Sequence, residues 1–68
     1  MSREIRVGDR IRDNDPRMPN RTLQVVRFSG GKAVCLDWSG RRFFIALPRI
    51  YTDGKARKSG FSLIEVQP

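Results

Sequence analysis

Apolar residues recur at every second position in several short segments of this chain, and turn-forming residues separate the segments. This alternation is typical of β-strands with one buried face, and no window longer than about ten residues has the 3.6-residue period of a helix. With 68 residues the chain forms one domain, residues 1–68, and a domain this small buries only about 60% of the surface of its unfolded chain. The sequence therefore predicts a single all-β domain with a thin core.

Five strands can be placed from the alternation, at residues 5–11, 21–29, 33–38, 41–47 and 61–66. Gly30-Gly31 is expected to form a tight hairpin turn, because consecutive glycines supply the positive φ that such turns require. Pro48 donates no backbone N–H and therefore stops the fourth strand, and one short 3₁₀ turn is expected at residues 48–51. Five short antiparallel strands fit a small closed or nearly closed barrel, which leaves no exposed sheet edges.

The expected core is formed by one apolar face of these strands. In the second strand, Val26 and Phe28 fall out of phase with Leu23, which predicts a bulge or burial on both faces. Trp38 ends the third strand in phase with Val34 and is expected in the core. The alternative is that its ring stacks on a base or anchors a protein interface. The expected core residues are Val7, Ile11, Leu23, Val25, Val34, Leu36, Phe43, Ile45 and Leu63.

Positive charge is concentrated in the second half of the chain. Residues 39–58 carry six basic side chains and one acid, Asp53, whereas residues 1–38 carry eight basic and five acidic side chains. A concentrated positive field attracts polyanions, and aromatic rings among the charges give bases a surface to stack on. The expected nucleic-acid-binding residues are Arg41, Arg42, Phe44, Arg49, Tyr51, Lys55, Arg57 and Lys58.

Parts of this set have a purely structural alternative. Arg42 and Phe44 share one face of a strand, where they can hold a phosphate and stack on a base. The alternative is a solvated face with Phe44 packed under the loop at residues 52–60. The basic cluster at residues 55–58 can likewise neutralise phosphates or simply keep its loop soluble.

Residues typical of catalysis and metal binding are scarce. The chain has no histidine and one cysteine, which excludes an internal disulfide, zinc fingers, and Ser–His–Asp or Cys–His catalysis. Asp13 and Asp15 provide too few ligands for Ca²⁺ or Mg²⁺ and are expected to cap their loop. Cys35 lies among apolar residues and is expected to be buried and unreactive. We therefore expect a protein that is not an enzyme, with no metal and no cofactor.

The chain also lacks the sequence features of membrane insertion. Its N-terminus is charged every few residues and has no apolar signal region. The longest apolar run, residues 43–47, is far shorter than the roughly 20 residues that a helix needs to cross a bilayer. We therefore expect a soluble, cytoplasmic protein with no membrane partner.

Two sets of motifs resemble known groups of small proteins. The segment Val7-Gly8-Asp9-Arg10-Ile11-Arg12, followed after a loop by Thr22-Leu23-Gln24-Val25-Val26, resembles the opening of SH3-like barrels of the KOW and Tudor type. This resemblance implies an SH3-like barrel that contacts RNA or protein. The loop at residues 13–20 is longer and more acidic than in those domains.

The chain is also similar to a group of uncharacterised small proteins from bacteriophages and their bacterial hosts. The shared steps are Asn14-Asp15-Pro16-Arg17, Gly40-Arg41-Arg42 and Ser59-Gly60-Phe61. This resemblance implies a phage or prophage setting, and hence the host cytoplasm, but no particular activity.

Two main functions remain open at this point. The first is a small basic module that contacts the nucleic-acid backbone without sequence preference. The second is a phage-encoded module that docks on an acidic surface of a host or phage protein and modulates it, since positive charge also steers protein association. A minor structural part of a virion is a third possibility. SH3-like barrels have many unrelated functions, so the fold does not decide between these.

Overall fold

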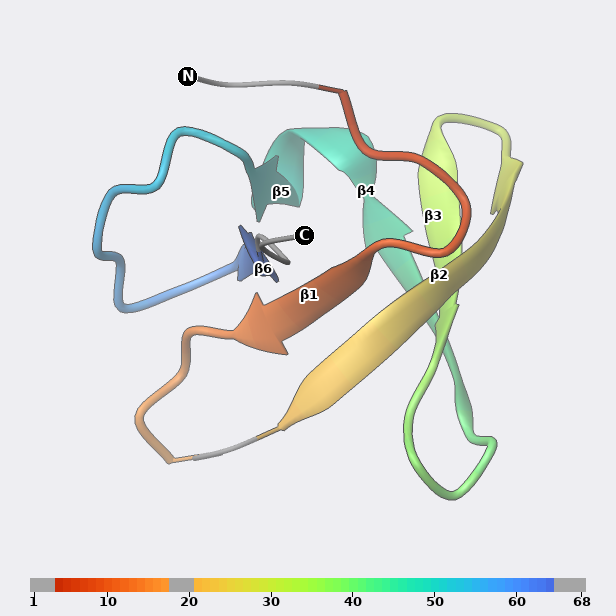
Figure 1. The fold of residues 1–68 in the computed structure, drawn as a ribbon, viewed down its shortest axis with the longest axis horizontal. Helices are drawn as coiled ribbons and strands as arrows, with labels where there is room; N and C mark the ends of the chain where they lie inside the picture. The colour runs from red at the N-terminus through yellow and green to blue at the C-terminus, as the bar shows by residue number, and fades with distance from the viewer. Residues whose placement is uncertain (1–3, 18–20, 65–68) are drawn as a thin grey trace.

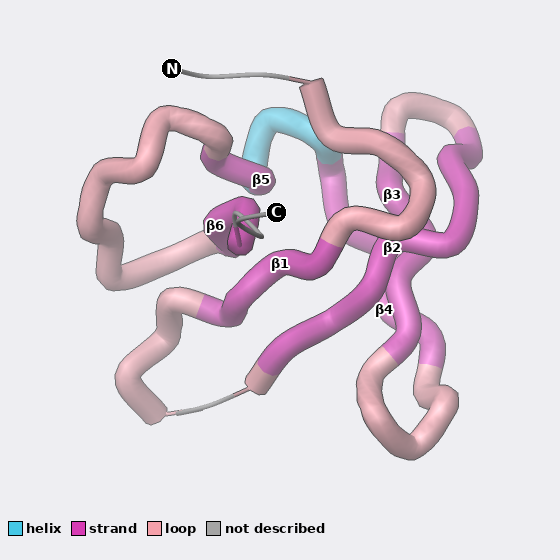
Figure 2. The backbone as a smooth tube through the Cα atoms, in the orientation of Figure 1, coloured by secondary structure: helices cyan, strands magenta, loops and turns pink. Residues whose placement is uncertain are grey.

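The structure, a computed structural model, describes residues 4–17 and 21–64. Its elements in these residues are strands and one 3₁₀ turn (Figures 1 and 2), which confirms the all-β prediction. No helix in the described part of the chain is long and apolar enough to cross a membrane. The elements are β1 (Arg10–Asp13), β2 (Thr22–Ser29), β3 (Lys32–Leu36), β4 (Arg42–Ala46), η1 (Leu47–Arg49), β5 (Ile50–Tyr51) and β6 (Phe61–Ile64).

The strands form one sheet in the order β4-β3-β2-β1-β6-β5. All neighbours are antiparallel except β5 and β6, which pair in parallel with Ile50 opposite Phe61. The expectation of about five antiparallel strands therefore missed the two-residue β5. Val66 was expected in the last strand and lies outside the described residues. Residues 18–20, the end of the expected loop after the first strand, lie outside them as well.

The sheet is open, which corrects the expectation of a closed or nearly closed barrel. Strands β4 and β5 are its two edges, and no ladder joins them within the described residues. The reason lies in η1, which follows β4 directly and contains Pro48. Proline donates no ladder hydrogen bond, and the 3₁₀ turn carries the chain from the β4 edge to β6, where β5 pairs instead.

A β-bulge interrupts β2 and confirms the prediction made from the phase of Val26 and Phe28. Val25 pairs with Cys35 and Arg27 pairs with Val34, so Val26 is an extra residue without a partner on β3. Directly paired residues point to the same face of a sheet. The bulge therefore turns Arg27 to the face opposite that of Val25.

The core lies on one side of the sheet. The buried cluster contains Ile11, Leu23, Val25, Ala33, Cys35, Ile45 and Ile50, with Ile5, Phe43 and Phe61 packed against it. Four predicted core residues are confirmed in this cluster, namely Ile11, Leu23, Val25 and Ile45, and Phe43 packs at its edge. Leu36 and Leu63 are half-buried.

The predicted phase of the third strand is wrong. Ala33 and Cys35 join the core cluster, whereas Val34 is buried outside it. In the ladder, Val34 lies between Arg27 and Phe44 on the opposite face of the sheet. Residues 33–36 are apolar throughout, so their pattern could not select a face.

Val7 and Trp38 were both expected in the core and are exposed, by 60% and 95% respectively. Each lies in a tight turn. The turn at Val7 is closed by the backbone N–H of Asp9, which donates to the carbonyl of Arg6 at 3.0 Å. The turn at Trp38 is closed by the N–H of Gly40, which donates to the carbonyl of Asp37, also at 3.0 Å. Both turns leave their apolar side chain outside the core.

Cys35 is expected to resist thiol reagents in the folded protein. Its side chain is fully buried, and this burial raises the pKa of the thiol. Only the thiolate reacts, so labelling by a disulfide reagent near pH 8 should be slow in buffer and fast in denaturant. Equal labelling rates in the two conditions would contradict the buried position.

Candidate nucleic-acid interface

The strand register sorts the side chains onto two faces, because paired residues share a face and successive residues alternate. One row across the sheet consists of Ile64, Arg10, Gln24, Leu36 and Arg42. We call the side of this row, away from the core, the outer face. Its strand residues are Arg10, Arg12, Thr22, Gln24, Arg27, Ser29, Lys32, Val34, Leu36, Arg42, Phe44, Ala46, Ser62 and Ile64.

The outer face carries cations without carboxylates at its strand positions. Its basic residues are Arg10, Arg12, Arg27, Lys32 and Arg42, all exposed. The ion pairs between described residues involve other cations, Arg17, Arg21 and Arg57. Adjacent strands lie about 4.8 Å apart, so Arg10 on β1 and Arg42 on β4 are separated by roughly 14 Å at the backbone. The result is a positive surface that spans several strands.

An aromatic ring lies among these charges. Phe44 on β4 is 56% exposed and lies in the ladder opposite Val34, which is buried. This exposure disfavours a Phe44 packed under the loop at residues 52–60, and in Figure 1 this loop lies at the left while β4 lies right of the centre. Arg42 and Phe44 therefore share an exposed face, as the sequence predicted.

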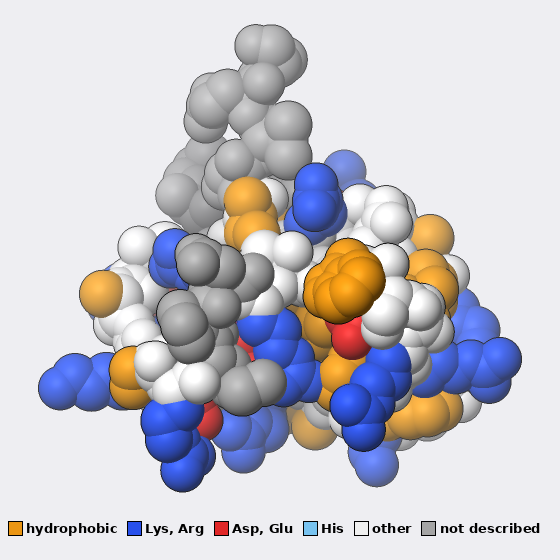
Figure 3. Space-filling model, turned by 90° about the horizontal axis from the view of Figure 1, so that it is seen from below, with side chains coloured by type: hydrophobic (Ala, Val, Ile, Leu, Met, Phe, Trp, Pro, Cys, Tyr) orange, Lys and Arg blue, Asp and Glu red, His pale blue; other side chains and the backbone are white. Residues whose placement is uncertain are grey.

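The other predicted binding residues do not join this surface. Arg41 is exposed at the turn between β3 and β4, whereas Lys55, Arg57 and Lys58 belong to the loop between β5 and β6. In Figures 1 and 2 the turn lies at the lower right and the loop at the left. Figure 3 likewise shows Lys and Arg side chains distributed around the outline of the molecule, with few acidic side chains between them. The charge concentrated in the sequence thus divides into two separate groups.

In the loop group, the side chains of Tyr51 and Arg57 are occupied by internal contacts. The guanidinium of Arg57 lies 3.8 Å from the ring centre of Tyr51 and also forms an ion pair with Asp53. Asp53 also accepts a hydrogen bond from the backbone N–H of Lys55, which is the main reason that the pKa of its carboxyl is lowered. The Tyr51 ring is therefore covered and the charge of Arg57 is compensated.

Arg49 and Lys58 line a hollow together with Asp13, Asp15 and Phe61. Both carboxylates take part in ion pairs, Asp13 with Arg21 at 3.6 Å and Asp15 with Arg17 at 3.0 Å. The mixed charge makes this hollow less attractive to a polyanion than the outer face.

The expected capping role of Asp13 and Asp15 is confirmed. Asp13 Oδ1 accepts the backbone N–H of Asp15 at 3.0 Å, and Asp15 Oδ1 accepts that of Arg17 at 2.9 Å. The side-chain hydrogen bond from Arg17 is the main cause of the lowered pKa of Asp15. Among the described residues, no cluster of three or more metal-ligating side chains occurs.

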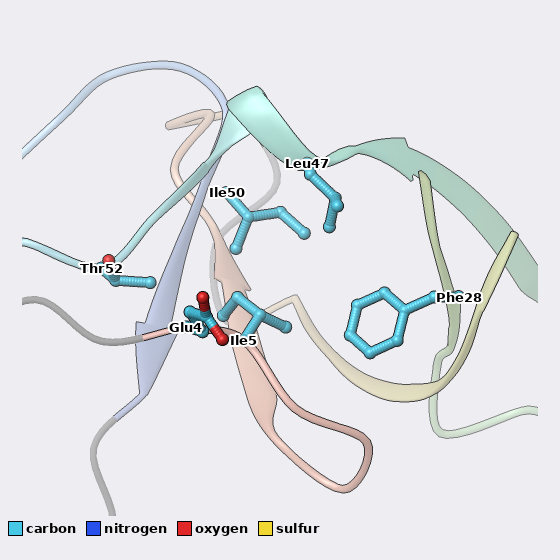
Figure 4. Close-up of a pocket in the computed structure, with 6 residues that line it drawn as sticks. All are labelled: Glu4, Ile5, Phe28, Leu47, Ile50 and Thr52. Atoms are coloured by element: carbon cyan, nitrogen blue, oxygen red, sulfur yellow. The ribbon is translucent and has the colours of Figure 1, made fainter. Parts of the chain in front are cut away.

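The core side of the sheet has a separate apolar hollow of about 450 Å³ (Figure 4). Ile5, Phe28, Leu47 and Ile50 line it, with Glu4 and Thr52 as its polar members. Phe28 and Leu47 are partly exposed, by 42% and 38%. The bulge in β2 turns Phe28 to this side, where it pairs with Ala33.

Comparisons with protein-family models, characterised proteins and solved structures find no match to this chain. The geometry of the outer face adds Arg10, Arg12, Arg27 and Lys32 to the residues that the sequence indicated. The sequence signal for them was alternation combined with strand pairing, because a cation on a strand faces outward when its neighbours enter the core.

Proposed function

We propose that this chain is a small non-enzymatic module that binds single-stranded nucleic acid along its outer face, without strong sequence preference. The observation that carries this proposal is the set of cations on that face, which have no carboxylate partner among the described residues, together with the exposed ring of Phe44 on the same face. In this proposal Arg10, Arg12, Arg27, Lys32 and Arg42 contact phosphates. Phe44 stacks on a base.

The preference for single strands follows from the type of surface. A duplex is read in sequence by an element that enters a groove, most often an α-helix, and the described residues contain no α-helix. Unpaired bases instead stack on aromatic side chains while the phosphates follow a positively charged surface. A sheet face with Phe44 among arginines provides both.

We further propose that the fold is an SH3-like barrel of the KOW and Tudor type whose sheet is not closed. This is supported by the run of consecutive antiparallel strands β1 to β4, the 3₁₀ turn after β4, and the pairing of β6 with β1. The bacteriophage resemblance adds the proposal that the protein acts in the cytoplasm of a bacterial host.

Reversing the charge of Arg27 and Arg42 is expected to weaken binding of a labelled single-stranded oligonucleotide by more than tenfold. Five phosphate contacts predict a log–log salt slope of about −3.5 for a single strand, and removing two contacts reduces it to about −2. Fluorescence anisotropy at several salt concentrations measures both quantities. The matched control is Arg57→Glu with Lys58→Glu, which makes the same net charge change in the loop and should leave the slope near that of the parent.

Two outcomes would count against this proposal. If both double variants lose affinity equally, the outer face is not the binding surface. If the parent binds no tighter than the non-specific range of roughly 10⁻⁴ M at physiological salt, the protein-interaction function becomes the better proposal.

The apolar hollow in Figure 4 favours that second function, because partly exposed Phe28 and Leu47 could receive an apolar side chain of a partner protein. A pull-down from host lysate, with and without nuclease, distinguishes the two functions. Support for the second requires a partner that survives nuclease and is lost with Leu47→Asp. Loss of every partner after nuclease treatment would argue for nucleic acid.

A further inference from the structure

We propose that a hollow beside Trp38 is a subsite for one unpaired purine base, an inference that rests on the proposed binding of nucleic acid. The hollow has a volume of about 250 Å³ and lies at the β3 end of the outer face. Its wall residues include Arg10, Gln24, Leu36, Asp37 and Trp38. None of them except Arg10 belongs to the phosphate-binding set above.

The turn that carries Trp38 is held by several hydrogen bonds. Asp37 Oδ1 accepts the backbone N–H groups of Ser39 and Arg41, each at 2.9 Å, and the Ser39 hydroxyl at 2.7 Å. The backbone N–H of Asp37 also donates to the carbonyl of Arg41 at 3.1 Å. The turn thus presents a 95% exposed indole in a fixed backbone position, which reduces the entropy lost when a ligand binds.

The chemistry of the walls suits a base better than a phosphate. The Trp38 ring offers a stacking surface and Leu36 an apolar neighbour. Gln24 can both donate to and accept from the edge of a base. The hydrogen bonds from the turn end on Oδ1 of Asp37, so Oδ2 faces no competing donor among the described residues and can accept an N–H of the base.

Asp37 also explains why a phosphate does not enter the hollow. Its pKa is lowered, chiefly by the hydrogen bond from the Ser39 side chain, so the carboxylate is negative and repels another anion. Arg10 shares the hollow but also belongs to the row of outer-face cations. A nucleic-acid strand can therefore keep one phosphate at Arg10 and place the attached base against Trp38. We assign a purine because the larger ring has more area to stack.

Trp38 is the only tryptophan of the chain, so intrinsic fluorescence reports on this subsite directly. An oligo-deoxyadenosine strand is expected to quench this fluorescence, and a strand of equal length with abasic sites should quench it far less. Trp38→Ala should weaken adenine-strand binding by roughly 5- to 100-fold, the range for a lost base–aromatic stack. Its effect on the abasic strand should be less than twofold. The control Val7→Ala, another exposed turn residue, should change neither affinity.

The outcomes separate this subsite from the proposed function. If Trp38→Ala binds the adenine strand as tightly as the parent while Arg27→Glu with Arg42→Glu does not, the subsite is wrong and backbone binding stands. Equal quenching by oligo-deoxythymidine would overturn the purine assignment. If no strand binds, the proposed function fails. AMP titrated to millimolar concentration then tests the hollow alone, and an unchanged Trp38 signal would overturn the subsite as well.

Discussion

Replacing Gly60 with alanine is expected to cost the fold about 3 kcal/mol, although it adds one methyl group. Gly60 is buried directly before β6 and has a φ of +70°, where an L-residue is strained. A Cβ atom there would lie 2.6 Å from Cε2 of Tyr51 and 2.8 Å from the carbonyl oxygen of Arg49. The backbone cannot retreat easily, because the carbonyl of Gly60 accepts the N–H of Asn14 at 3.0 Å.

Gly54→Ala provides a matched control in the same loop. Gly54 has a similar φ of +75°, but a Cβ atom there meets no atom within 4 Å. The Gly54→Ala variant should therefore lose only the stability that corresponds to backbone strain at a positive φ, about 1–2 kcal/mol. Urea unfolding of both variants and the parent measures the difference. Equal losses for the two variants would show that the contact with Tyr51 and Arg49 contributes nothing.

Replacing Ile11 with alanine is expected to destabilise the protein by about 2–5 kcal/mol, the range for a truncated core aliphatic side chain. Ile11 is fully buried on β1, which pairs with both β2 and β6. A cavity there weakens the packing of three strands at once. If the total stability is about 5 kcal/mol, the lower end of the usual range, the upper end of this loss removes nearly all of the free energy of unfolding.

Val7→Ala is the informative comparison for Ile11, because the apolar pattern places both residues in the core. Val7 lies in the turn before β1 and is mostly exposed. Its truncation should change the free energy of unfolding by less than about 0.5 kcal/mol. Thermal and urea unfolding of the two variants check this contrast. A large loss for Val7→Ala together with a small one for Ile11→Ala would contradict the assignment of the core.

Four of the predicted strands and the bulge in β2 match the structure, whereas β1 begins only at Arg10, five residues later than the alternation indicated. Alternation also placed Val7 and Trp38 in the core, where neither lies, and it could not assign a face to residues 33–36. Residues 33–36 are apolar without interruption, so the side of the sheet to which each side chain points depends on the pairing with the bulged strand β2. The two-residue β5 was missed because it is held in place by β6, a partner distant in sequence.

The position of Trp38 had a signal that the hydrophobic pattern concealed. Asp37-Trp38-Ser39-Gly40 has aspartate at the first and glycine at the fourth position, a pattern typical of a type I turn. Hydrophobicity favoured a core position for the ring, but the hydrogen bonds of Asp37 end the strand at Leu36. Local polar contacts overrode the apolar side chain here.

The candidate site was only partly predictable. Residues 1–38 carry a mixture of basic and acidic side chains. Counting charges along the chain therefore hides the contribution of these basic residues to the positive surface. The aspartates of that segment cap turns, as Asp9 does for the N–H of Arg6 at 2.7 Å and Asp37 for that of Ser39. Bases such as Arg10 and Arg27 remain on the strands. Separation of charge by secondary structure, rather than by sequence position, produces the outer face.

The bulge at Val26 has a consequence for how this protein can change over time. Leu23 and Arg27 are four positions apart, and on an uninterrupted strand an even separation would direct both side chains to the same side. One unpaired residue converts that even count into an odd one, so Leu23 points to the core and Arg27 to the outer face of the same strand. A single-codon deletion of Val26 would therefore remove the bulge and still leave Arg27 opposite Val34 and Phe28 opposite Ala33, whereas deletion of a paired residue such as Gln24 would move the side chains that precede it to the other face. Loss of Val26 should therefore be tolerated better than loss of a paired residue of β2.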